Sequence, residues 1–96
     1  MIGPDEQEIV GGWTFAEGKM SADEEAIRIR RLVREHLVEV ARDASGWDVL
    51  YRDPDDDRYW ELTYPQSEMH GGGPPKLTCL SNEEVSTKYG DAALAK

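Results

Sequence analysis

The chain has 96 residues, which suits a single domain, and 39% of them are hydrophobic, with three tryptophans and four tyrosines. This composition excludes disorder as the expected state, and no stretch approaches the ~20 apolar residues that span a bilayer. The net charge of −9 disfavours binding to nucleic acid or to an anionic membrane. Acidity suits solubility, or fast capture of a basic partner.

The N-terminal sequence MIGPDEQEIV has neither the basic nor the apolar region of a secretory signal, so we expect a cytoplasmic location. The single cysteine, Cys79, excludes an internal disulfide and is expected to be a small buried residue in a strand. Together with His36 and His70 it does not supply the four ligands of a structural zinc site. We therefore expect no metal and no cofactor.

The first half of the chain predicts one strand and one long helix. Residues 8–15 form a strand-like segment, in which a pair of glycines marks a bulge or a close backbone approach. Residues 22–44 predict a helix, with a capping box of Ser21 and Glu24 at its start and Gly46 just beyond its end. Apolar residues recur there at spacings of three and four, which places them on one helix face. They are Ala26, Ile29, Val33, Leu37, Val40 and Ala44.

A β-hairpin is the next predicted element. Residues 47–52 and 58–64 have the composition of antiparallel strands, and the aspartate-rich segment 53–57 with its proline predicts the turn between them. Side chains alternate along the second strand. One face takes Arg58, Trp60, Leu62 and Tyr64, and the other takes Tyr59, Glu61 and Thr63.

The rest of the chain predicts a loop, a strand and a short helix. Residues 66–75 are too rich in glycine and proline for a regular element. Residues 76–80 then predict a strand, and residues 81–89 a helix that begins with a capping box and ends before a glycine. The two ends, 1–7 and 91–96, are expected to fray.

These elements predict an α+β fold in one domain, residues 1–96. One long helix packs on a small, mostly antiparallel sheet of about four strands, with a short C-terminal helix. The long helix covers one sheet face, and aromatic residues on the other face would form a binding patch. The aromatic residues of the hairpin are Trp47, Tyr51, Tyr59, Trp60 and Tyr64.

Groupings that resemble catalytic sites each lack a necessary part. Residues 70–73, HGGG, resemble an esterase oxyanion loop, but there is no G-x-S-x-G motif. The glycines also lack the lysine and hydroxyl residue of a phosphate-binding loop. Glu61 and Glu68 can be paired as catalytic carboxylates, yet nothing in the sequence marks a cleft around them. His36 is expected mid-helix, as a surface or partly buried residue rather than a catalyst.

The predicted hairpin turn has three alternative interpretations. Asp53, Asp55 and Asp57 resemble the start of a calcium loop, but Arg58 and Tyr64 replace the required glycine and glutamate. A solvated turn, a weak surface cation site and an acidic prong for a basic partner remain open.

The segment Leu50–Pro75, about a quarter of the chain, contains RYWELTYPQSE-x-HGGGPP, whose order of aromatic, acidic and glycine residues is specific. It resembles the immunity protein 27 family, which is associated with bacterial polymorphic toxin systems. The resemblance implies a glycine just before Arg58, where this chain has Asp57. The motif residues are Arg58, Tyr59, Trp60, Glu61, Tyr64, Pro65, Gln66, Ser67, Gly71, Gly72, Gly73 and Pro74.

The resemblance implies a protein that is made beside a toxin, binds it and blocks it in the producing cell, without catalytic residues. The acidity adds the hypothesis that this toxin domain is basic. Our candidates for toxin contacts are Asp53, Asp55, Asp56, Asp57, Glu68 and His70. One alternative function is a generic acidic adaptor domain. Another is a small enzyme or ligand-binding domain centred on Glu61, Glu68 and His70.

Overall fold

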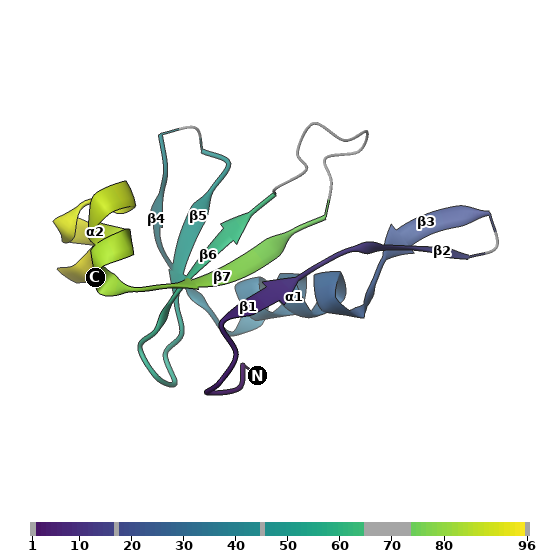
Figure 1. Ribbon diagram of the computed structural model, residues 1–96, viewed down its shortest axis with the longest axis horizontal. Coiled ribbons are helices and arrows are strands. Elements are labelled where there is room, and N and C mark those ends of the chain that lie inside the picture. The colour runs from purple at the N-terminus through teal and green to yellow at the C-terminus, as the bar shows by residue number, and fades with distance from the viewer. Residues whose placement is uncertain (1, 17, 45, 65–73, 96) are drawn as a thin grey trace.

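The computed structural model describes residues 2–16, 18–44, 46–64 and 74–95, and its α+β architecture confirms the predicted class (Figure 1). The main sheet has the antiparallel order β1-β7-β6-β5-β4, with β1 (Glu8–Val10), β7 (Lys76–Leu80), β6 (Tyr59–Thr63), β5 (Val49–Arg52) and β4 (Val38–Arg42). The other elements are β2 (Trp13–Ala16), β3 (Lys19–Ala22), α1 (Glu24–Glu35), α2 (Asn82–Tyr89) and the 3-10 helix η1 (Asp91–Ala95). Among the described residues, no helix is both long and apolar enough to cross a bilayer.

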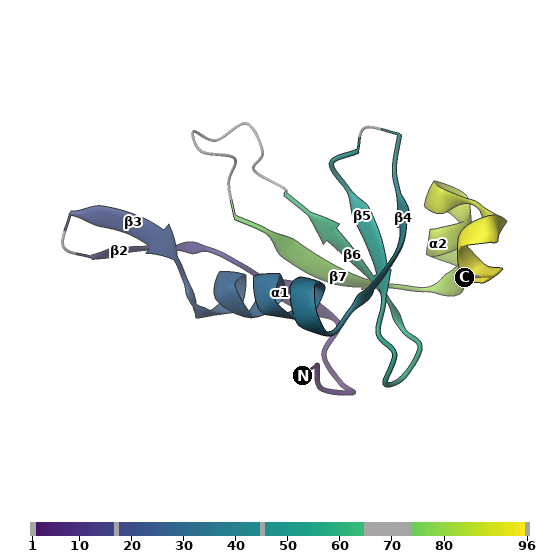
Figure 2. The ribbon, with the colours of Figure 1, turned by 180° about the vertical axis from the view of Figure 1, so that it is seen from behind.

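Different helices cover the two faces of the main sheet. Figures 1 and 2 show α1 against one face, α2 at one end of the molecule, and the β2–β3 hairpin projecting from the other end. Ile29 and Leu32 of α1 pack on a cluster that contains Trp60 of β6. Val85 of α2 packs on a second cluster that contains Tyr59. Neighbouring residues of β6 therefore point into two different cores, as the predicted alternation requires.

The long helix predicted over residues 22–44 is wrong in its second half. Helix α1 ends at Glu35, and the backbone N–H groups of His36 and Leu37 both donate to the Leu32 carbonyl. The chain then enters β4, which pairs with β5 and has a bulge around Val40. Two β-branched valines favour a strand there, and pairing with β5 buries Val40 in the second core.

The caps predicted for that helix also differ. Asp23, not Ser21, caps α1, and its Oδ1 accepts from the backbone N–H groups of Ala26 at 2.8 Å and Gly12 at 3.0 Å. Gly46 lies in the β4–β5 turn, with a positive φ of 79°. Its N–H donates to Asp43, which makes it a turn glycine and not a helix cap.

The strand predicted over residues 8–15 divides at its glycines into β1 and β2. Gly11 donates its N–H to the Pro75 carbonyl, and a Cβ at this position would lie 2.6 Å from that oxygen. The close backbone approach expected for the glycine pair is therefore present. β1 pairs with β7, which settles the position of the first strand in the sheet.

The predictions for the last strand and helix are confirmed. β7 has the expected bounds, although Cys79 within it is only half-buried. Burial raises the pKa of the Cys79 thiol, and Arg58 opposes that rise. Ser81 and Glu84 form the predicted capping box of α2, and Gly90 follows its end.

Fraying was expected at both ends of the chain, and the described residues there, 2–7 and 91–95, make contacts with the rest of the fold. Residues 91–95 form η1, which buries Ala93 in the cluster around Tyr59. At the other end, the Glu6 carboxylate accepts hydrogen bonds from the Arg28 guanidinium at 2.7 and 2.9 Å. That guanidinium, followed by the Gly3 backbone N–H, holds the pKa of Glu6 at about 2, below its ordinary 4.5.

We predict that Glu6 makes stability depend on acid pH. Because its pKa is lower in the folded state, its contribution is complete above pH about 4.5 and is lost as the pH falls towards 2. Glu6→Gln should therefore flatten the fall in free energy of unfolding over this range, measured by urea titration at several pH values. Asp5→Asn, an exposed neighbour, is the control; an equal flattening by Asp5→Asn would contradict the assignment.

Candidate functional site

The candidate site is the turn between β5 and β6, residues 53–58, together with the end of α1. Asp53 organises this turn, because its N–H donates to the Arg58 carbonyl and its carbonyl accepts from Asp57, both at 2.8 Å. Its carboxylate also accepts from the Asp55 N–H at 2.9 Å. The residue is 1% exposed. Asp53 therefore supports the turn from inside and offers little surface to a partner.

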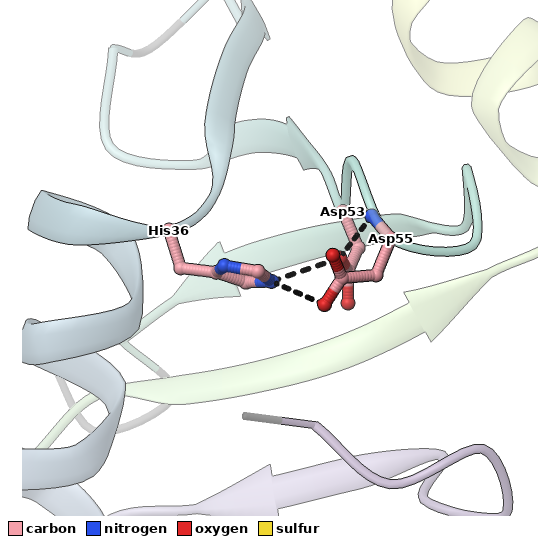
Figure 3. Close-up of side chains that lie close together, drawn as sticks. All are labelled: His36, Asp53 and Asp55. Atoms are coloured by element: carbon pink, nitrogen blue, oxygen red, sulfur yellow. Dashed lines mark hydrogen bonds and ion pairs between the residues drawn. The ribbon is translucent and has the colours of Figure 1, made fainter.

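His36 joins this turn to α1 (Figure 3). Its Nε2 lies 3.0 Å from Oδ1 of Asp53 and 3.2 Å from Oδ2 of Asp55. The expected mid-helix position of His36 is wrong: it is the C-cap residue of α1, and its side chain is 19% exposed. Sequence reasoning missed this residue because it extended the helix through positions that form β4.

Arg58 fastens the turn to the N-terminal segment. Its guanidinium donates to the carboxylate of Asp56 and to the carbonyls of Gly3 and Glu6, at 2.7 to 2.9 Å. It also lies 5.0 Å from the centroid of the Trp60 ring. Partial burial alone would raise the pKa of Asp56, but hydrogen bonds from Arg58 outweigh it and hold this pKa below its usual value. The turn therefore cannot move without breaking several charged contacts.

The three exposed aspartates of the turn each have a basic partner. Asp55 faces His36, Asp56 binds Arg58, and Asp57 accepts from Arg52 at 2.7 Å. The two arginine contacts reduce the local negative charge, while the carboxylates stay at the surface. The turn thus presents acids in fixed positions rather than as a loose acidic run.

Glu61 is one of the three residues of the alternative enzyme hypothesis. It lies on the sheet face that α2 covers and forms an ion pair with Lys88. Its Oε2 is 2.6 Å from the Lys88 ammonium and accepts from the Tyr89 hydroxyl at 2.7 Å. Burial, and then the hydrogen bond to Glu61, raise the pKa of Tyr89. A groove of about 350 Å³ along α2 includes Glu61 in its lining. The other two members of that hypothesis, Glu68 and His70, lie outside the described residues.

The expected aromatic patch on the uncovered sheet face is wrong. α2 and η1 cover that face, and Tyr59 is buried beneath them. Trp60 and Tyr51 are buried under α1, and Tyr64 is half-buried beside them. Trp47 alone among these hairpin aromatics is exposed, with 63% of its surface accessible. Most of the aromatic residues therefore build the two cores.

Among the described residues, one group can hold a metal ion. It consists of His36, Asp53 and Asp55, whose candidate ligand atoms all lie within 4.8 Å of one another. The sequence comparison with a calcium loop had grouped Asp57, rather than His36, with Asp53 and Asp55. The Asp57 carboxylate instead contacts Arg52.

Comparison with known families gives a match to immunity protein 27 over residues 15–81, more than half of the chain. The chain belongs to the immunity protein 27 family. The resemblance seen in the sequence is thus confirmed. Proteins of such families are in general inhibitors rather than enzymes, which agrees with the expected lack of catalysis. No curated protein and no solved structure matched the chain.

The motif residues of this family that the structure describes have structural roles. Trp60 and Tyr59 fill the two cores, Glu61 binds α2, and Arg58 anchors the N-terminal segment. Pro74 and Tyr64 are half-buried at either side of the undescribed segment 65–73. That segment contains Pro65, Gln66, Ser67, Glu68, His70, Gly71, Gly72 and Gly73.

The departure from the family pattern at Asp57 has a clear physical meaning. Its φ is 61°, in the left-handed region, and no other described non-glycine residue has a positive φ. Glycine adopts this conformation freely, which explains a glycine in the family pattern, and aspartate tolerates it better than most residues.

We predict that Asp57→Gly is more stable than Asp57→Ala by about 1 kcal/mol, the approximate cost of a Cβ in the left-handed region. Both variants lose the Arg52 contact, so the comparison isolates the backbone. Urea unfolding monitored by tryptophan fluorescence measures the difference. An alanine variant as stable as the glycine variant would show that the turn has another conformation.

Proposed function

We propose that this protein neutralises a cognate toxin by binding it in the cytoplasm of the producing cell. The observation that carries the proposal is the family match over residues 15–81. Family membership implies a toxin partner. Which surface of this protein binds the toxin is a further part of our proposal.

The 53–58 turn is the surface that we favour. The carboxylates of Asp55, Asp56 and Asp57 project from a hairpin end that is held by Arg52, Arg58 and His36. Fixed side chains lose little conformational entropy on binding, which favours affinity. Acidic groups complement a basic toxin surface and speed its capture. Glu68 and His70 remain candidate contacts, whereas Asp53 acts by holding the turn.

Co-expression with the toxin encoded beside this gene tests immunity by binding. We expect cells to survive only when this protein is present, and the two proteins to co-purify. Survival without a complex would contradict inhibition by binding and favour the alternative of an enzyme or ligand-binding domain. A stable complex with a different protein, and no protection from the toxin, would favour the generic adaptor.

A matched pair of charge variants tests the binding surface. Asp55→Asn/Asp57→Asn removes two charges from the turn, and Glu24→Gln/Glu83→Gln removes two exposed charges elsewhere. At low salt we expect the first variant to associate with the toxin roughly tenfold more slowly, because steering depends on charge near the contact. The second should stay near wild type. Equal effects, measured by stopped-flow fluorescence, would remove the turn from the interface.

A further inference from the structure

We propose that His36, Asp53 and Asp55 form a binding site for a divalent first-row transition metal ion, for which Zn²⁺ is the test ion. The site lies where the end of α1 meets the β5–β6 turn (Figure 3). It is independent of the toxin, and no part of the family comparison assigns it.

The geometry brings three ligand atoms to one point from two separate elements. Zn²⁺ binds histidine nitrogen and carboxylate oxygen at about 2.0–2.2 Å, so neighbouring ligands of a tetrahedral site stand roughly 3.4 Å apart. The His36 Nε2 atom is 3.0 Å from one Asp53 oxygen and 3.2 Å from one Asp55 oxygen. Both distances are shorter than this spacing by only about 0.2 to 0.4 Å, and all three atoms lie within 4.8 Å of one another.

The donor set favours a transition metal over calcium or magnesium. Imidazole nitrogen suits zinc, copper, iron and nickel, whereas calcium and magnesium prefer sites built from oxygen alone. Two carboxylates supply compensating negative charge, and Asp53, at 1% exposure, is held rigidly in the turn. Asp55, whose side chain is 54% exposed, is the ligand that can rotate to admit an ion.

Two of the three ligand residues are accessible to solvent. A groove of about 390 Å³ runs along α1, and His36 and Glu35 are part of its lining. The Asp55 side chain is 54% exposed and that of His36 is 19% exposed, so two of the three ligand residues border solvent from which an ion can enter. The ion would replace the proton through which His36 Nε2 contacts the two carboxylates.

Metal binding would strengthen a connection on which the candidate toxin surface depends. The ligands come from the C-cap of α1 and from the first and third residues of the turn. An ion held by the folded protein and not by the unfolded chain stabilises the fold as its concentration rises. It would also fix the Asp55 carboxylate in place.

Calorimetric titration of the purified full chain with Zn²⁺ tests the site, with thermal unfolding as a second readout. We expect one ion per chain and a melting temperature that rises with Zn²⁺ concentration. His36→Gln and Asp55→Asn should each weaken binding by roughly tenfold or more, as loss of one of three ligands requires. Asp55→Asn changes an exposed side chain, so it decides the matter if His36→Gln fails to fold.

Two controls separate this site from general attraction of cations to an acidic protein. Asp57→Asn removes the same charge from the same turn, and His70→Gln removes the other histidine. Both should bind Zn²⁺ as the wild type does. The proposal is overturned if the wild type gives neither heat nor a thermal shift at millimolar Zn²⁺. It is equally overturned if Asp57→Asn loses as much affinity as Asp55→Asn, or if His36→Gln loses none.

Discussion

The alternation of side chains along β6, the central strand of the main sheet, is the constraint on which the structure depends. Trp60 points into the core beneath α1, and its neighbours Tyr59 and Glu61 point to the face covered by α2 and η1. A slip of one residue would exchange these faces and place the Glu61 carboxylate in an apolar core. The register of β6 against β5 and β7 therefore positions both helices and both ends of the chain.

The sequence predicted best where the structural signal is local. The β5–β6 hairpin, the last strand and the capping box of α2 depend on residues a few positions apart, and each is present as expected. The helix prediction for residues 36–44 was wrong because their apolar residues fit a helical period and a strand almost equally. Pairing with β5, which is a tertiary contact, decided in favour of β4. Likewise, no local sequence pattern indicated that η1 would cover the second sheet face.

The candidate site was predicted in part for the same reason. The aspartates of the turn stand out in the sequence, but their partners are distant or belong to elements that were mispredicted. His36 is 17 positions from Asp53, and it reaches the turn only because α1 ends at Glu35. Asp53 is buried at this contact, which its place in an aspartate-rich turn did not indicate. Conversely, the glycine expected before Arg58 did indicate a left-handed backbone conformation. Asp57, which occupies that position, has the positive φ that this pattern implies.

We propose that the protein meets its toxin through the 53–58 turn. Hydrogen–deuterium exchange of the protein, free and in complex with its cognate toxin, is the most direct test of this proposal. We expect the backbone amides of this turn to exchange more slowly in the complex, with smaller changes over α2. Unchanged exchange in the turn, with protection confined to other segments, would contradict it.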